Sequence, residues 1–206
     1  EAGCKNYISA AKNSFDGVFC EGLPSFACIS EKARSTGKKV LLLSDGPDDC
    51  LGGYELDRIL CEDVIKRPNK MNEKRKVNLQ LYKNFPFYFR PIHGGTTSSA
   101  MKKIFSPNFL KFYDPIFGSL PKNKKFIYEN FDISQKMALS YAFYSLPDYF
   151  NTRIDRGSMM HSIESRVPLQ APSIVNMMIG TPYEWRYKYG YTKYIFRKLV
   201  ERYIGK

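Results

Sequence analysis

The sequence predicts a mixed α/β domain that contains a parallel sheet and becomes mostly helical in its carboxy-terminal half. Two observations predict the sheet: a helical pattern leads into the apolar run Val40–Leu43, and an acid-rich loop follows that run. A short apolar run bounded by turn residues is typical of a fully buried parallel strand. Helix, strand and loop in this order make half of a βαβ unit. The third observation is a series of helical patterns from Asp132 onward.

The helix before the strand is expected from Pro24 to Thr36. Pro24 suits the first helical turn, where the N–H that proline lacks would have no partner within the helix. Gly37 then ends the helix. Three apolar residues share its expected inner face: Phe26, Ile29 and Ala33. A doubly wound sheet needs several more strands than Val40–Leu43, so we expect that an amino-terminal part of this domain is missing.

The loop after the strand carries three carboxylates within five residues: Asp45, Asp48 and Asp49. Gly46-Pro47 predicts a turn between the first acid and the other two. Gly52-Gly53 allows backbone conformations in which a larger residue would clash. Acids just past the carboxyl end of a strand lie where open α/β sheets bind ligands. A surface loop whose acids contact only water is the alternative, and the residues alone leave both interpretations open.

Helical spacing continues along the rest of the chain. We expect helices at residues 54–64, 73–85, 134–145, 151–166, 173–179 and 192–204. In the first of these, the residues expected to face inward are Leu56, Ile59, Leu60 and Val64. In the last, they are Ile195, Phe196, Leu199 and Val200. Pro147 is expected near the start of a new helix, and Pro168 and Gly180 mark helix ends.

Composition limits the classes of function. The chain has 206 residues, enough for one large domain or one and a half small ones, and 43% of them are hydrophobic, enough for a substantial core. It contains no run of about 18 apolar residues, so we expect no membrane span. Five cysteines without a Cys-x-x-Cys pair, and only two histidines, argue against a zinc site. Reduced thiols in a cytoplasm are the simplest interpretation.

The net charge of +12 raises the question of nucleic-acid binding. Basic residues cluster at residues 66–76 and 122–125, but no signature of a nucleic-acid-binding module accompanies them. A solvated basic face, or attraction for polyanionic nucleotides, is therefore favoured over binding to DNA.

Two later segments combine charged and small residues. Residues 154–169 read Ile-Asp-Arg-Gly-Ser-Met-Met-His-Ser-Ile-Glu-Ser-Arg-Val-Pro-Leu, on what we expect to be a helix whose small residues allow close packing. A buried Glu164–Arg166 pair that only fixes the helix end is the structural alternative to catalysis. Residues 191–198 read Tyr-Thr-Lys-Tyr-Ile-Phe-Arg-Lys. There Thr192 can cap a helix and place Lys193 in its first turn. That lysine opposes the helix dipole, which suggests an anionic partner such as phosphate, although the residues alone favour a solvated lysine.

Together these three segments resemble the synthetase domain of asparagine synthetase. The loop resembles the family's Ser-Gly-Asp/Glu-Gly-x-Asp-Glu-x-Phe-Gly-Gly-Tyr, with Asp49 in place of Glu and Leu43-Ser44 in place of Ser-Gly. Residues 155–169 resemble Asp-Arg-x-Ser-Met-x-x-Ser-x-Glu-x-Arg-x-Pro-Phe, and residues 192–197 resemble Thr-Lys-x-x-Leu-Arg. The resemblance implies a truncated, adenine-nucleotide-hydrolase-like (Rossmann-like) parallel sheet. It also implies adenylation of a carboxylate with ATP and Mg²⁺, followed by displacement of AMP by an amine.

The resemblance also implies roles for individual residues. Asp45 would accept a proton from the incoming amine, Lys193 would neutralise charge on the phosphates, and Glu164 would orient the substrate or that lysine. Asp48 would hold Mg²⁺. The substrate would contact Asp48, Asp49 and Arg166, and ATP would contact Ser44, Gly46 and Lys193. Ala171 stands where the family has an aspartate, so no role transfers to it.

Two parts of the family pattern are not found in this sequence: the nucleotide-binding Ser-Gly-Gly-x-Asp-Ser loop and a glutaminase domain with a leading cysteine. We therefore expect a fragment of a glutamine-dependent amidotransferase, inactive as a synthetase on its own. The expected substrates are aspartate and ammonia from glutamine. The same fold acting on a sugar acid, a peptide or a β-lactam precursor stays open, as does a basic binding module without catalysis. No membrane or nucleic-acid partner is expected, and a homodimer of the intact protein is left open.

Overall fold

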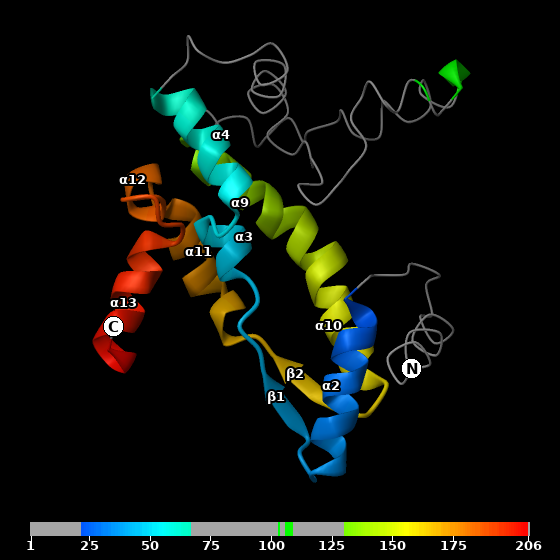
Figure 1. Ribbon diagram of the computed structural model, residues 1–206. Coiled ribbons are helices and arrows are strands. Elements are labelled where there is room, and N and C mark those ends of the chain that lie inside the picture. The colour runs from blue at the N-terminus through cyan, green and yellow to red at the C-terminus, as the bar shows by residue number, and fades with distance from the viewer. Residues whose placement is uncertain (1–21, 67–102, 104–105, 109–129, 206) are drawn as a thin grey trace. The chain divides into compact units, whose positions relative to one another are not determined.

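The computed structural model describes residues 22–66, 103, 106–108 and 130–205 (Figure 1). The chain divides into two compact units. The first comprises Glu1–Cys50 and Ala142–Met178, and the second comprises Leu51–Tyr141 and Ile179–Lys206. The helix expected at residues 73–85 and the basic cluster at residues 122–125 lie outside the described residues, as does the cluster at residues 66–76 beyond its first residue.

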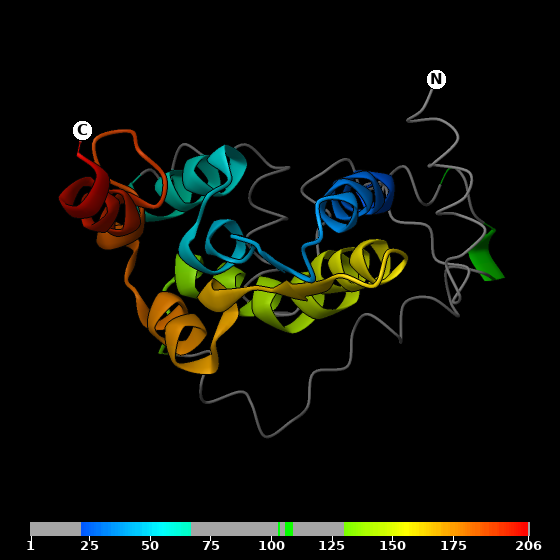
Figure 2. The same cartoon turned by 90° about the horizontal axis from the view of Figure 1, so that it is seen from below.

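The first unit pairs two helices with two parallel strands. In chain order these are α2 (Leu23–Ser35), β1 (Val40–Leu42), α10 (Thr152–Met159) and β2 (Glu164–Arg166). The strands lie side by side in Figure 1, with Val40 opposite Glu164 and Leu42 opposite Arg166. Helices α2 and α10 pack on each other, and α10 also contacts β2 (Figure 2). The predicted parallel pairing and α/β character are confirmed for this unit.

Gly157 brings the two helices close together. A Cβ atom at Gly157 would lie 2.6 Å from the Cβ of Phe26 and 3.0 Å from the carbonyl oxygen of Leu23. Only a residue without a side chain fits there, because real Cβ atoms do not approach other heavy atoms so closely. The expectation that small residues in the 154–169 segment allow close packing is confirmed at this position.

Both helices of the first unit end in the same way before their strands begin. At the end of α2, Gly37 has φ +76°, and the N–H of Lys38 donates to the carbonyl of Ala33. At the end of α10, Ser162 has φ +53°, and the N–H of Ile163 donates to the carbonyl of Ser158. A left-handed residue followed by such a backbone bond is the Schellman termination of a helix. The chain therefore leaves both helices sharply and enters a strand.

The expected helix at residues 151–166 is consequently wrong in its last part. Helix α10 ends at Met159, and Glu164–Arg166 form β2. The N–H of Glu164 donates to the carbonyl of Lys39, which begins the strand ladder. Ile163 is fully buried directly after the left-handed Ser162, so its burial stabilises the turn.

Two other details of the first unit differ from expectation. Strand β1 is not fully buried, because Val40 and Leu42 are 37% and 72% exposed. The described sheet has two strands, and α10 contacts β2, so the described elements leave much of β1 uncovered. On α2 the buried residues are Leu23, Pro24, Ala27 and Ser30, whereas Ile29, which was expected inside, is 52% exposed.

A π-helix, η3 (Tyr141–Asn151), precedes α10 and contains Pro147 in its interior. The expected new helix beginning near this proline is therefore wrong. A π-helix has wider turns than an α-helix, and such turns occur where an α-helical hydrogen bond is interrupted. The hydroxyl of Thr152 donates to the carbonyl of Pro147 over 3.0 Å, which satisfies a backbone group in this segment.

The second unit has a small core between helices. Helix α4 (Glu55–Lys66) contacts α9 (Ile133–Ser140), and α9 contacts α12 (Tyr183–Arg186). The buried residues that form the core are Cys61, Ile133, Met137, Tyr183 and Tyr187. Asp132 caps α9 in a capping box with Gln135, and its second carboxylate oxygen accepts from the N–H of Tyr183 over 3.0 Å. One aspartate thus stabilises the start of α9 and positions α12.

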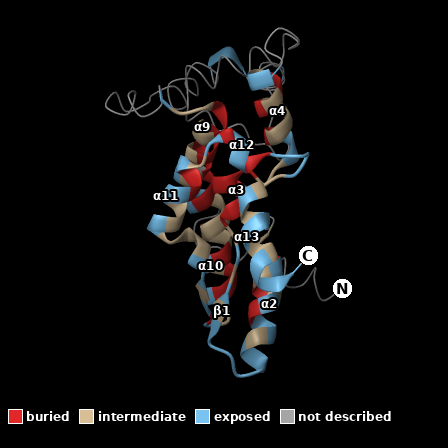
Figure 3. Ribbon diagram, turned by 90° about the vertical axis from the view of Figure 1, so that its left-hand side faces the viewer, coloured by how far each residue is buried: buried red, intermediate tan, exposed pale blue. Residues whose placement is uncertain are grey.

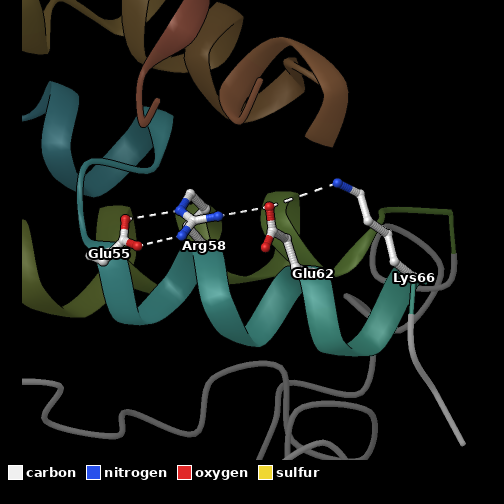
Figure 4. Close-up of polar contacts among 4 residues, drawn as sticks. All are labelled: Glu55, Arg58, Glu62 and Lys66. Carbon is white, nitrogen blue, oxygen red and sulfur yellow. Dashed lines mark hydrogen bonds and ion pairs between the residues drawn. The ribbon is translucent and has the colours of Figure 1, made fainter. Parts of the chain in front are cut away.

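A chain of ion pairs runs along α4 (Figure 4), and the side chains of its central members, Arg58 and Glu62, are only 16% and 19% exposed. Arg58 pairs with Glu55 and, over 2.7 Å, with Glu62, which also lies 3.7 Å from the amine of Lys66. These residues are three or four positions apart, the spacing at which charged side chains meet on a helix. Of the residues expected to face inward, Leu60 and Val64 pack against the core, whereas Leu56 is 61% exposed. The buried residues of α4 are Asp57, Cys61 and Asp63.

Helices α11 (Pro172–Gly180) and α13 (Tyr194–Ile204) agree with the expected positions. The expected burial in α13 is wrong at Ile195 and Leu199, which are 40% and 47% exposed. No residue of α13 is buried, as its pale blue and tan ribbon shows (Figure 3). Among the described helices, none has the length and apolar character needed to cross a bilayer.

Candidate functional site

The acid-rich segment directly follows β1, but part of it is helical. Pro47–Leu51 form a short helix, α3, with Asp48 and Asp49 in its first turn. Carboxylates are favourable there because they complement the unpaired N–H groups of a helix amino terminus. Asp48 is partly exposed, whereas Asp49 is only 3% exposed. The predicted turn at Gly46 is confirmed by its φ of +114°.

Gly46 is held closely from the opposite side. A Cβ atom at Gly46 would lie 2.9 Å from the Cγ of Gln170, so any larger residue would displace that side chain. The amide of Asn151 in turn donates to the side-chain oxygen of Gln170 over 2.8 Å. Since the carbonyl of Gly46 also accepts from the N–H of Cys50 over 2.8 Å, the backbone next to Asp45 is fixed.

Asp45 pairs with an arginine that the sequence reasoning missed. Its Oδ1 lies 3.4 Å from a terminal nitrogen of Arg153, near the start of α10. The guanidinium of Arg153 lies over three aromatic rings, at 4.5 Å from the centroid of Phe150, 5.4 Å from Tyr149 and 5.5 Å from Phe26. The available signal was an arginine three and four positions after two aromatic residues, a spacing that brings side chains together on one helix face.

Glu164 and Arg166 form an exposed ion pair on β2. Their side chains are each 59% exposed, and the Nε of Arg166 donates to a carboxylate oxygen of Glu164 over 2.7 Å. This hydrogen bond lowers the pKa of Glu164 and raises the pKa of Arg166, so both stay charged near neutral pH. The buried pair considered as a structural alternative is not what the structure shows, and both groups are accessible to solvent.

The strand register distinguishes the ends of this pair. Leu43 donates its N–H to the carbonyl of Arg166 over 2.9 Å, so Arg166 lies at the carboxyl end of the two strands. Ser44, which is exposed, and Asp45 follow at this same end. Glu164 is opposite Val40, at the amino end. The structure thus brings Arg166, rather than Glu164, to the edge of the sheet where the acid-rich segment begins.

Lys193 belongs to the second unit and has an unusual backbone. It precedes α13 as its N-cap in the left-handed conformation, with φ +50° and ψ +40°. The expected placement in the first helical turn, with Thr192 as the cap, is therefore wrong by one residue. The carbonyl of Thr192 instead accepts from the Nε of Arg197 over 2.9 Å. A left-handed conformation costs a residue with a Cβ atom about 1–2 kcal/mol, and such outliers are concentrated at functional sites.

A backbone hydrogen bond holds Lys193 in this position. Its N–H donates to the carbonyl of Gly52 over 3.3 Å, and its own carbonyl accepts from the N–H of Arg197 over 3.0 Å. Gly52 belongs to the Gly52-Gly53-Tyr54 end of the first sequence segment. Within the second unit, the first and third segments are therefore in direct contact.

A cavity of about 700 Å³ lies beside Lys193. Its lining is basic and aromatic: Tyr189, Tyr191, Lys193, Tyr194, Arg197 and Lys198 all contribute, and Glu201 adds one acid. The ammonium of Lys198 lies 2.8 Å from a carboxylate oxygen of Glu201. The remaining excess of positive charge suits an anionic group such as phosphate.

The partly exposed carboxylate of Asp48 is the group by which the acid-rich segment could contact a magnesium ion. Across the described ranges, no group of three His, Cys, Asp or Glu residues lies close enough to hold a metal ion. A single partly exposed carboxylate, such as that of Asp48, is sufficient for Mg²⁺ when nucleotide phosphates and water supply the other oxygens.

The family described as asparagine synthase matches residues 6–206. The chain belongs to the asparagine synthase family. No match was found among curated proteins or among solved structures. Membership in the asparagine synthase family places all three sequence segments in one family domain, which confirms the resemblance on which their roles depend. It supports a ligase-like, ATP-dependent activity that forms amides.

Proposed function

We propose that this chain is the synthetase part of a ligase that adenylates a carboxylate and then transfers nitrogen to it. The simplest substrate is aspartate, with nitrogen derived from glutamine and asparagine as the product. The observation that carries the proposal is the family match over residues 6–206, which includes the acid-rich segment and Lys193. The left-handed backbone of Lys193 beside a basic cavity supports a role for this lysine with phosphates.

The reaction has two steps in this proposal. In the first, a carboxylate oxygen attacks the α-phosphorus of the substrate ATP, the bond to the β-phosphate oxygen breaks, and pyrophosphate leaves. Lys193 neutralises the charge that develops on the phosphates. In the second, the amine nitrogen attacks the acyl carbon, AMP leaves with the electron pair of the broken bond, and Asp45 accepts the proton from nitrogen.

The other assigned residues bind and orient. Arg166 lies at the carboxyl end of the strands and would pair with a negatively charged group of the carboxylate substrate. Asp48 would hold Mg²⁺ on the ATP phosphates, and the ion supplies neutralisation of phosphate charge when it is bound. Asp49 is only 3% exposed, so in this proposal it supports α3, and its substrate contact requires movement of the segment. Glu164 would orient the substrate or Lys193.

The fold proposed for the whole domain is a Rossmann-like parallel sheet. Parallel strands are normally covered on both faces, and the described sheet contains β1 and β2 alone. The exposure of Leu42 supports further elements covering this strand, because an apolar residue 72% exposed on a strand is otherwise unfavourable.

A basic binding module without catalysis is the second candidate. The observation that favours it is the combination of cations and aromatic rings beside α13, since such surfaces bind single-stranded nucleic acids. Binding of an oligonucleotide that weakens steeply with salt and is unaffected by D45N would support this alternative.

The proposed function is tested by measuring AMP and pyrophosphate release with a panel of carboxylates, using the natural protein that carries this sequence. The expected result is carboxylate-dependent AMP formation that falls about 100-fold or more in K193M, because one charge-stabilising donor is worth about that factor. K32M is the matched control, since Lys32 is exposed in the last turn of α2. Carboxylate-independent rates, or equal rates in both variants, would contradict the proposal.

A further inference from the structure

We propose that Arg153 is a positioning residue for Asp45, and this inference rests on the proposed function. Asp45 can accept a proton from an amine efficiently only if its carboxylate is held in a consistent orientation. Arg153 supplies this restraint within the first unit, where its terminal nitrogen lies 3.4 Å from Oδ1 of Asp45.

The guanidinium of Arg153 is itself held in place. It lies 4.5 Å from the ring centroid of Phe150, 5.4 Å from that of Tyr149 and 5.5 Å from that of Phe26. Stacking of a planar cation on aromatic faces restricts its rotation, and lysine cannot reproduce this because its ammonium is not planar. The side chain is only 18% exposed, so its charge needs a carboxylate partner.

The absence of a side chain at Gly22 makes room for this arginine. A Cβ atom at Gly22 would lie 2.9 Å from the Cδ of Arg153. The arginine therefore extends along the backbone just before α2. The aromatic rings that its guanidinium contacts belong to α2 (Phe26) and to η3 (Tyr149 and Phe150). Elements from two distant parts of the sequence, residues 22–26 and 149–153, build one arginine-binding cage.

Asp45 is fixed on its backbone side by independent contacts. Gly46, with φ +114°, lies beneath Gln170, and Gln170 accepts a hydrogen bond from Asn151. Neither contact involves Arg153, so the backbone of Asp45 has one set of restraints and its carboxylate has another. The ion pair engages Oδ1, and a carboxylate has a second oxygen, Oδ2, that can accept from an amine.

The first arm of the test separates the two half-reactions in the natural protein. R153M should leave carboxylate-dependent exchange of pyrophosphate into ATP within about 2-fold and lower amide formation about 10- to 100-fold, since Asp45 acts only after adenylation. R153K should lie between R153M and the parent, because it keeps the charge without the stacked plane. R34M is the matched control, since Arg34 is exposed in the last turn of α2.

Non-additivity provides the readout that a merely structural role would not give. The double variant D45N/R153M should form amide no more slowly than D45N alone, because both substitutions remove the same function, proton acceptance by a positioned Asp45. Added guanidinium should restore part of the rate to R153M, and urea, its neutral analogue, should not. The inference would be overturned if the rate loss in the double variant equalled the product of the two single losses. It would also be overturned if R153M slowed both half-reactions equally.

The second arm does not require catalysis and uses the 206-residue chain. The carboxyl ¹³C resonance of Asp45, assigned by its loss in D45N, should shift in R153M, stay in place in R34M, and return towards its parental position when guanidinium is added. If the enzyme shows no exchange of pyrophosphate, the proposed function fails while this arm still decides the Asp45–Arg153 relationship. An Asp45 resonance that is the same in R153M and the parent would overturn the inference.

Discussion

The backbone N–H of Lys193 donates to the carbonyl of Gly52 across 3.3 Å, joining two segments that are 141 residues apart in the sequence. Gly52 has φ +76°, and Lys193 has φ +50°. Two left-handed residues therefore meet in one hydrogen bond of the second unit. Substitutions at these two positions should have opposite effects on stability, because glycine adopts this conformation freely and lysine does not.

Replacing Gly52 by alanine should strongly destabilise the fold. A Cβ atom there would lie 2.3 Å from the hydroxyl oxygen of Tyr187, which belongs to the core of the second unit. Overpacking and a left-handed alanine together should cost about 2–4 kcal/mol in the free energy of unfolding, measured by urea denaturation. G180A is the control, since nothing lies within 4 Å of its Cβ position, and it should change stability by less than about 1 kcal/mol. Equal effects of the two substitutions would show that Tyr187 does not lie over Gly52.

Replacing Lys193 by glycine should separate stability from activity. K193G relieves the left-handed strain and should raise the free energy of unfolding by about 1 kcal/mol, while AMP formation is lost with the ammonium group. K193A keeps a Cβ atom, so it should lose activity without gaining stability. A K193G variant no more stable than K193A would contradict the observed backbone conformation.

Replacing Ser162 by glycine should stabilise the first unit. Ser162 has φ +53° at the Schellman end of α10, a position that glycine usually occupies. S162G should raise the free energy of unfolding by about 0.5–1 kcal/mol in chemical denaturation. S165G is the opposite control, since Ser165 lies within β2 and glycine weakens a strand. If S162G destabilised the protein, the helical prediction for residues 160–166 would be correct after all.

Tyr183 should make stability depend on alkaline pH. Burial, together with the nearby carboxylate of Glu62, raises its pKa from 10.0 to about 12. Below a pH of 10.0, the unperturbed pKa, the phenol is protonated in both the folded and the unfolded state, so its full contribution to stability is present. Between the two values only the unfolded state loses the proton, so stability falls as pH rises. Absorbance of tyrosinate should show a step near pH 12 that disappears in Y183F, and its persistence would assign the step to another tyrosine.

Residues that act through their own backbone preferences made the fold partly predictable. Pro24 and Gly37 mark the two ends of α2 because one lacks a donor and the other tolerates positive φ. Ser162 performs the same function as Gly37, but serine carries no sequence signal for a left-handed conformation. The strand at Glu164–Arg166 was therefore predicted as helix.

Burial was less predictable than helix position. Periodicity alone predicts that apolar residues such as Leu42 and Ile195 lie inside, whereas they are 72% and 40% exposed. Burial depends on which elements cover a face, and this is a tertiary property. Conversely, the polar residue Asp57 on α4 is only 3% exposed, and the hydroxyl of Tyr141, from a distant segment, donates to its carboxylate over 3.5 Å.

In the candidate site too, some residues could be recognised from a local sequence pattern and others could not. Asp45, Asp48 and Gly46 were recognisable because acids and glycine follow an apolar run, and the structure places them after β1 as expected. Arg153 was missed because its role depends on Phe26, which lies 127 positions earlier in the chain. A cation held by rings from distant elements leaves only a partial trace in a local pattern.

Adenylation of the carboxylate is the central claim, and an isotope transfer tests it most directly. The natural protein that carries this sequence would be incubated with ATP, an amine source and aspartate labelled with ¹⁸O in its side-chain carboxylate, and the products would be analysed by mass spectrometry. Attack of that carboxylate on the α-phosphorus predicts one ¹⁸O atom in the phosphate of AMP. Label found in inorganic phosphate instead, or AMP without label while amide is formed, would contradict the account.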